Sequence, residues 1–157
     1  PPRSTPKPSS AASDVYKRQL QNMGTPDYLI SAATQLVVAQ RLARKNCKDC
    51  RVPDDDVNPK VLQDLGFSAE QASRVKAIKG KGCAKCSNTG YKGRQGIYEI
   101  LVVSKPLKEA ILRQATTPEL REIGIKEGFQ TMQDMGRRLI ASGELNFREY
   151  ERVLSGE

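Results

Sequence analysis

The feature that most constrains this chain is the placement of its four cysteines in two C-x2-C pairs. In each pair the two intervening residues let the backbone turn back on itself, so that both thiolates can bind the same ion. Two such pairs complete a tetrahedron of sulfur around zinc, and the absence of histidine excludes a mixed site. Protein would fill all four positions, so the sequence predicts a structural rather than a catalytic zinc site at Cys47, Cys50, Cys83 and Cys86.

Three other interpretations of these cysteines stay open. Two disulfides would require an oxidising compartment, and an iron–sulfur centre also uses four thiolates. A redox dithiol would need a thioredoxin-like βαβ unit, which the flanking sequence does not offer. The segment between the pairs, 51–82, is longer than a usual zinc-ribbon spacing and is expected to form a small substructure. Basic residues flank the cysteines and are expected to offset the negative charge of the site: Lys45, Lys48, Arg51, Lys81 and Lys85.

Hydrophobic spacing and capping residues predict mainly helices, with one strand. Residues 20–46 have apolar side chains at steps of three and four, which predicts one long helix with its approach. A loop is expected over 51–59, followed by two short helices, the second capped by Ser68. Residues 95–103 are rich in β-branched and aromatic side chains, which predicts a strand. Further helices are expected over 107–114, 117–128, 131–142 and 146–154, the last capped by Asn146 with Glu149.

The first 19 residues resemble the translation of a sequencing adapter, so residues 1–19 are predicted to be a non-native, disordered leader. The chain would then be a fragment whose native amino terminus is lost. Leaving out this leader lowers the net charge from +8 to +5, because it holds four basic side chains and one acidic one. A charge of that size is modest for a dedicated nucleic-acid binder.

The glycine-rich basic segment 90–96 does not have the G-x4-G-K-[ST] pattern of a phosphate loop, and a predicted strand follows it. We therefore expect a structural turn there. Without histidine, no Ser/His/Asp or Cys/His catalytic set can be assembled. No apolar run approaches the roughly 20 residues of a membrane span, and the composition indicates a cytosolic protein.

The order of the motifs resembles the C-terminal part of the type II secretion and type IV pilus assembly ATPases. The resemblance covers residues 20–157 and rests first on four segments: LVVAQRL at 36–42, C-x2-C at 47–50, GCAKCSNTGYKGR at 82–94 and GIYE at 96–99. The helical tail is also similar, at GFQTM (128–132) and GELNF (143–147). Retraction ATPases of the same superfamily generally lack the four cysteines, so the resemblance favours assembly or secretion.

This resemblance implies an α+β, mainly α-helical fold in three parts. Residues 20–46 would be the C-terminal helix of a RecA-like ATPase domain, and residues 47–98 a four-cysteine zinc subdomain with a short β element. Residues 99–157 would form a C-terminal helical subdomain.

The resemblance also implies a function for the intact protein. Family members are cytoplasmic homo-hexamers, peripheral at the inner membrane, that hydrolyse ATP with Mg and drive an inner-membrane platform protein. Their Walker motifs lie upstream of the part seen here, so this fragment is expected to be inactive alone. The alternative is a stand-alone zinc-ribbon-like nucleic-acid-binding module, which predicts exposed aromatic side chains among the basic ones and a larger positive charge.

Overall fold

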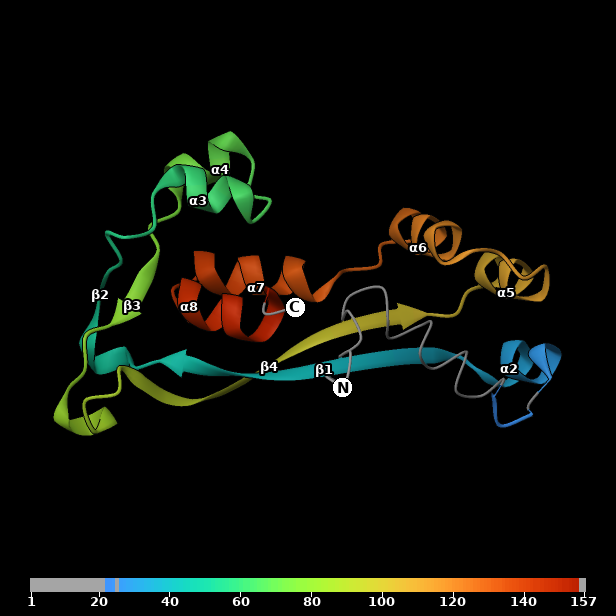
Figure 1. Ribbon diagram of the computed structural model, residues 1–157, viewed down its shortest axis with the longest axis horizontal. Coiled ribbons are helices and arrows are strands. Elements are labelled where there is room, and N and C mark those ends of the chain that lie inside the picture. Colours follow the sequence, from blue (N-terminus) through green and yellow to red (C-terminus); the bar gives the residue numbers. More distant parts are fainter. Residues whose placement is uncertain (1–21, 25, 156–157) are drawn as a thin grey trace, which may run out of the picture. The chain divides into compact units, whose positions relative to one another are not determined.

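The computed structural model describes residues 22–24 and 26–155 (Figure 1). The predicted leader, residues 1–19, lies outside the described residues. Within them the chain divides into two compact units, each built from two separate stretches of sequence. The first unit contains residues up to Gln40 and Tyr98–Thr131, and the second contains Arg41–Ile97 and residues 132–155.

Two long strands form one two-stranded sheet: β1 (Leu36–Asn46) and β4 (Tyr91–Val102). They run in opposite directions, as the arrowheads in Figure 1 show. The boundary between the units falls within both strands, so each strand contributes residues to each unit.

The prediction of one helix over residues 20–46 is wrong. A short helix, α2 (Asp27–Ala33), is followed by strand β1, and the Gln35 carbonyl accepts a hydrogen bond of 2.9 Å from the Val103 amide. Side chains along the first part of β1 alternate between exposed and half-buried, as in a strand with one covered face. The same apolar residues fit helical spacing, but pairing with the distant strand β4 decides their conformation.

In the first unit, helices α5 (Lys105–Leu112) and α6 (Thr117–Lys126) follow β4. Ser104 caps α5 by accepting from the Leu107 amide, and Thr116 with Glu119 forms a capping box on α6. Both helices lie within two residues of the predicted spans 107–114 and 117–128. Their apolar sides enclose a small core made of Val103, Leu107, Ala110 and Leu120.

In the second unit, two short strands that the sequence did not indicate pair antiparallel, β2 (Arg51–Pro53) and β3 (Ile78–Gly80). Between them lie α3 (Pro59–Asp64) and α4 (Ala69–Arg74), capped by Asn58 and by the predicted Ser68 capping box. The predicted substructure is therefore present, although residues 51–53 are a strand rather than part of a loop. Short 3-10 turns, η1 (Lys48–Cys50) and η2 (Ala84–Cys86), carry the second cysteine of each pair.

The second unit is completed by α7 (Met132–Ala141), α8 (Phe147–Tyr150) and the π-helical turn η3 (Glu151–Ser155). Gly136 lets these elements pack closely, because a Cβ there would lie 2.5 Å from Leu154 Cδ1 and 2.6 Å from Tyr150 Cε2. The fold is thus mixed helix and strand, as expected, with more strand than predicted. No helix in the described part of the chain combines the length and apolar character needed to cross a bilayer.

Candidate metal centre

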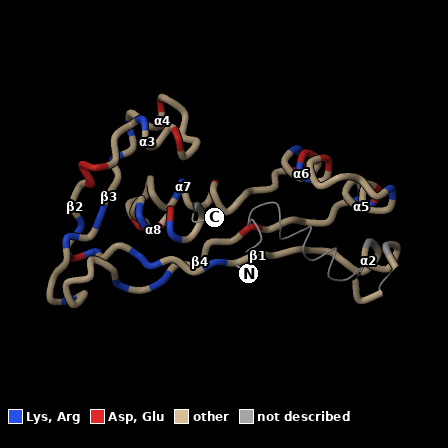
Figure 2. The backbone as a smooth tube through the Cα atoms, viewed as in Figure 1, with Lys and Arg blue, Asp and Glu red and all other residues tan. Residues whose placement is uncertain are grey.

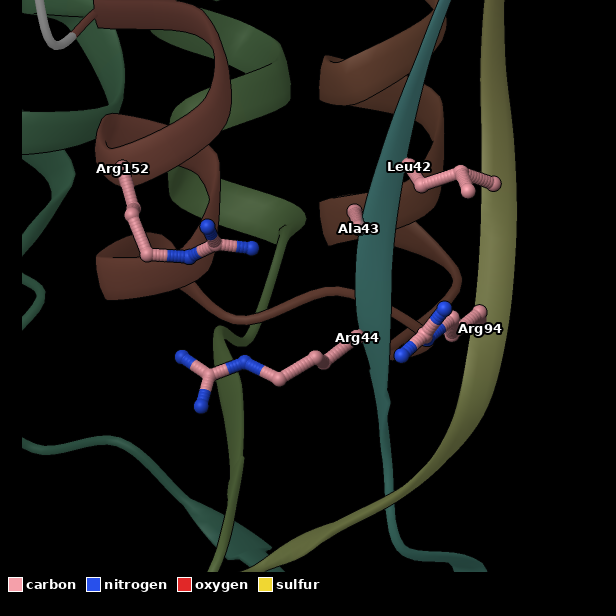
Figure 3. Close-up of a pocket in the computed structure, with 5 residues that line it drawn as sticks. All are labelled: Leu42, Ala43, Arg44, Arg94 and Arg152. Carbon is pink, nitrogen blue, oxygen red and sulfur yellow. The ribbon is translucent and has the colours of Figure 1, made fainter.

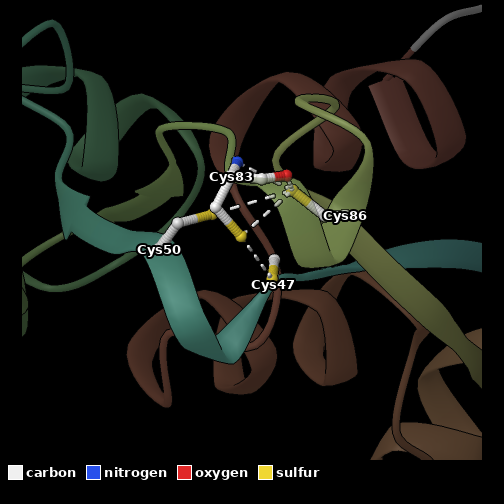
Figure 4. A group of neighbouring side chains, drawn as sticks. All are labelled: Cys47, Cys50, Cys83 and Cys86. Carbon is white, nitrogen blue, oxygen red and sulfur yellow. Dashed lines mark hydrogen bonds between the residues drawn. The ribbon is translucent and has the colours of Figure 1, made fainter.

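The structure brings all four predicted cysteines together (Figure 4). Their sulfurs lie within 4.8 Å of one another. Cys47 Sγ is 3.9 Å from Cys83 Sγ, Cys50 Sγ is 3.9 Å from Cys86 Sγ, and Cys83 Sγ is 3.7 Å from Cys86 Sγ. Four donors from two remote segments therefore surround one point.

These separations match one tetrahedral ion. Zinc–sulfur bonds of about 2.3 Å in a tetrahedron place neighbouring sulfurs about 3.8 Å apart. A disulfide would require about 2.05 Å, and all four cysteines are free. An iron–sulfur cluster would also need room for its inorganic sulfides between the thiolates. The donor set and its size thus fit a single thiophilic ion such as zinc.

Backbone amides point at two of the sulfurs. Gly82 donates to Cys50 Sγ at 3.3 Å, and Cys83 and Gly90 donate to Cys86 Sγ at 3.2 and 3.3 Å. Such donors stabilise negative charge on sulfur and orient the ligand.

The thiols of Cys50 and Cys86 differ in pKa. Burial raises the pKa of the Cys50 thiol to about 12. Burial acts the same way on Cys86, but the amides of Cys83 and Gly90 outweigh it and lower the pKa of that thiol to about 6. Cys86 therefore offers a thiolate at neutral pH, whereas Cys50 would lose its proton when a cation binds.

The two cysteine turns are also joined backbone to backbone. The Cys47 amide donates to the Gly90 carbonyl at 2.8 Å, and the Lys81 amide donates to the Cys50 carbonyl at 2.9 Å. A Cβ at Gly80 would lie 2.0 Å from the Gly90 oxygen. Glycine at position 80 is thus required for this close approach of the two backbones.

Some of the basic residues around the cysteines are already paired with carboxylates. Lys85 contacts Asp49 at 2.6 Å, and Lys45 contacts Glu144 at 2.8 Å. The hydrogen bond from Lys85 holds the pKa of Asp49 below its usual range. These two lysines therefore offset the charge of the sulfurs less than the sequence suggested.

A buried carboxylate close to the first cysteine pair was not anticipated as a functional residue. Glu149 is fully buried, and its carboxylate accepts from Arg44 Nε and Nη2 at 2.9 and 2.6 Å and from Arg152 Nε at 2.9 Å. Asn146 caps α8 as predicted, but Glu149 does not complete a capping box. No local pattern pairs Glu149 with a residue 105 positions earlier.

The side-chain amides of Asn146 and Asn46 extend the hydrogen bonds around Glu149 to the residue that precedes Cys47. Asn146 Nδ2 donates to Asn46 Oδ1 at 3.0 Å, and Asn46 Nδ2 donates to the carbonyls of Ile78 and Gly143 at 2.9 and 3.1 Å. The C-terminal helices and the metal-binding turns are therefore parts of one packed unit.

The sequence of this chain is similar to those of known proteins. A family model described as type II/IV secretion system protein matches residues 8–152. The type IV pilus assembly ATPase PilB of Thermus thermophilus is 37% identical over 75% of this chain and 13% of its own length. PilB of Myxococcus xanthus is 32% identical over 83% of this chain and 23% of its own length.

The type II secretion system ATPase E of Vibrio cholerae is 32% identical over 76% of this chain and 26% of its own length. The chain belongs to the type II/IV secretion system protein family, in agreement with the resemblance seen in its motifs. It spans from about an eighth to about a quarter of the length of these relatives. The matched span includes residues 8–19, and the adapter origin of the leader stays a prediction.

Proposed function

We propose that this chain is the C-terminal part of a cytoplasmic, hexameric ATPase that powers type IV pilus assembly or type II secretion. The observation that carries the proposal is the family match over residues 8–152, together with relatives whose names are those of pilus assembly and secretion ATPases. In the intact protein, ATP hydrolysis with Mg would take place upstream and drive an inner-membrane platform protein.

The four cysteines would hold a structural zinc ion in this motor. Their sulfur separations of 3.7–3.9 Å and the amides directed at Cys50 and Cys86 support this role. The ion would join residues 47–50 to residues 83–86, so the second unit would depend on it for folding. It would have no open position for water and no part in hydrolysis.

An exposed apolar face in the first unit supports the assignment to a larger protein. The Gln40–Tyr98 side-chain hydrogen bond of 3.3 Å places the outward residues of β1 and β4 on the same face. Those residues are about half exposed or more: Leu36, Val38, Ile100 and Val102. A contiguous apolar face of this kind marks a protein interface. We propose that upstream residues of the ATPase cover it.

The nucleic-acid-binding alternative has less support. Lys79 lies 2.7 Å from Asp54 and 3.0 Å from Asp56, and Lys85 pairs with Asp49. Asp54 is buried, and it belongs to the acidic segment drawn red directly after β2 in Figure 2. The basic residues of this region are therefore partly neutralised by neighbouring carboxylates, which does not favour a phosphate-tracking surface.

The proposal is tested by recovering the complete gene and measuring ATP hydrolysis by the whole protein and by the 157-residue chain. We expect Mg-dependent hydrolysis by the whole protein only. A complete gene that encodes no nucleotide-binding motif upstream would overturn the assignment. Metal content, measured separately on the purified chain, tests the zinc site independently of hydrolysis.

A further inference from the structure

The second unit contains a cavity of about 330 Å³ whose lining is unusually rich in arginine. Figure 3 shows its five lining residues: Leu42, Ala43 and Arg44 from β1, Arg94 from β4 and Arg152 from η3. Three of the five lining side chains carry a guanidinium group, and none of the five carries a carboxylate.

Two of the guanidinium groups are held in place from behind. Glu149, fully buried, binds Arg44 through Nε and Nη2 and binds Arg152 through Nε and Nη2. Arg44 also stacks over the Tyr91 ring at 4.1 Å. These contacts fix both groups, so little conformational entropy would be lost when a ligand binds them.

Hydrogen-bonding capacity remains on all three arginines. A guanidinium offers five N–H donors, and no residue of 22–24 or 26–155 accepts from the Nη1 groups of Arg44 and Arg152. Arg94 is exposed and has no hydrogen-bond or ion-pair partner among those same residues. The three arginines carry three positive charges, and the one carboxylate of Glu149, which binds Arg44 and Arg152 but not Arg94, leaves a net charge of +2.

We propose that this cavity binds a phosphate group, either as a free phosphate or pyrophosphate or as the phosphate of a lipid headgroup. Planar guanidinium groups match the paired oxygens of a phosphate, and a phosphate group supplies the negative charge and several acceptors that the site lacks. Leu42, which is about half exposed, adds an apolar side chain to the lining, which suits the ester carbon next to such a group. This site is separate from the four cysteines and from ATP hydrolysis, so it does not rest on the proposed function.

The test uses the full chain in three binding assays. Calorimetry measures inorganic phosphate and pyrophosphate, and sedimentation measures vesicles of phosphatidylglycerol against vesicles of phosphatidylcholine. The decisive variant is Arg94→Gln, because this residue makes no contact on which the fold depends. Its matched control is Arg121→Gln, an exposed arginine of the first unit that loses the same charge.

We expect saturable binding to at least one phosphate-bearing probe, weakened about tenfold by Arg94→Gln, the loss of one charge-assisted pair. Arg121→Gln should bind like the parent chain. Saturation with free phosphate or pyrophosphate identifies a soluble ligand, and saturation with phosphatidylglycerol vesicles alone identifies a lipid headgroup. The Nε–H signals of Arg44 and Arg152 in ¹⁵N spectra should shift on binding.

Two results would overturn the proposal. One is the absence of saturable binding to every probe. The other is an equal loss of affinity in both variants, which would indicate attraction to the general positive charge of the chain. Thermal midpoints of the two variants, measured without ligand, establish that both remain folded.

Discussion

The buried carboxylate of Glu149 holds two arginines of the second unit. It is fully buried between Arg44 and Arg152, and the Arg44 amide also donates to it at 2.7 Å. Arg44 and Arg152 are themselves about half exposed, with 48% and 54% of their side-chain surface accessible. Removing Glu149 therefore costs mainly its charge-assisted hydrogen bonds and the cavity that is left in its place.

Glu149→Ala should therefore lower the free energy of unfolding by about 2–3 kcal/mol. Urea unfolding followed by circular dichroism measures this change. The matched control is Glu151→Ala, two positions along and exposed, which should change stability by no more than about 0.5 kcal/mol. Similar losses in both variants would show that Glu149 has no special role.

Stability should also depend on pH through Glu149. Burial disfavours its ionised form, but hydrogen bonds from Arg152 and Arg44 outweigh that effect and hold the pKa at about 2, below the ordinary value of 4.5. A depressed carboxyl pKa stabilises the folded state above the unfolded pKa, and the stabilisation is lost as the pH falls from about 4.5 towards about 2.

The thermal midpoint of the parent chain should therefore fall in that acid range more steeply than the midpoint of Glu149→Gln. Because acid also protonates the cysteine ligands, the comparison is made between the two chains at each pH. Parallel curves for the parent and the variant would contradict the assignment.

At the scale of elements, the approach of β3 to the start of β4 leaves no room for a side chain. Gly80→Ala would place a Cβ 2.0 Å from the Gly90 oxygen, and the Gly90 amide donates to Cys86. We expect this variant to destabilise the chain by more than about 3 kcal/mol and to retain less zinc.

Gly93→Ala is the matched control. Its Cβ would meet nothing within 4 Å, and only its positive φ of 83° opposes the change. We expect a cost of about 1 kcal/mol and full metal content. Thermal denaturation and metal analysis of both variants provide the measurement, and equal zinc loss would show that the Gly80–Gly90 contact is not what matters.

The sequence predicted those helices and strands whose capping residues or side-chain types lie within the element itself. The capping box at Ser68 and the cap at Asn146 form as predicted, and the β-branched run before Val103 is a strand. The apolar residues of 36–46 fit the three-and-four spacing of a helix and also the alternation of a strand, so the sequence pattern wrongly predicts a helix. Only pairing with the distant strand β4 selects the strand conformation. Strands β2 and β3 are three residues each, too short to give a sequence signal.

The same distinction applies to the sites. The C-x2-C spacing predicted that all four cysteines cluster, because each pair of metal-binding thiolates comes from residues close in sequence. The contacts of Glu149 with Arg44 depend on the tertiary fold, and so does the cavity that Arg44, Arg94 and Arg152 line together. No short-range rule predicts them.

At the scale of the whole molecule, the two units should respond differently to metal removal. The cysteines all lie in the second unit, whereas the core of Val103, Leu107, Ala110 and Leu120 lies in the first. Chelation should therefore speed amide exchange across residues 47–90 and leave the 103–120 core largely protected. Hydrogen–deuterium exchange with and without chelator measures this.

Cys83→Ser is the corresponding variant, and it should lower zinc content and the thermal midpoint together. Uniform loss of protection in both units would indicate that they unfold as one cooperative structure. Unchanged exchange in both units would show that the metal does not stabilise the fold.

The alternating origin of the two units has a consequence for synthesis on the ribosome. Neither unit is continuous in sequence, because 98–131 return to the first and 132–155 return to the second. Arg44 emerges long before Glu149, and the metal-binding turns are complete before α7 and α8 exist. The apolar surface that α7 and α8 cover in the folded unit therefore stays exposed on the nascent chain until both helices have left the exit tunnel.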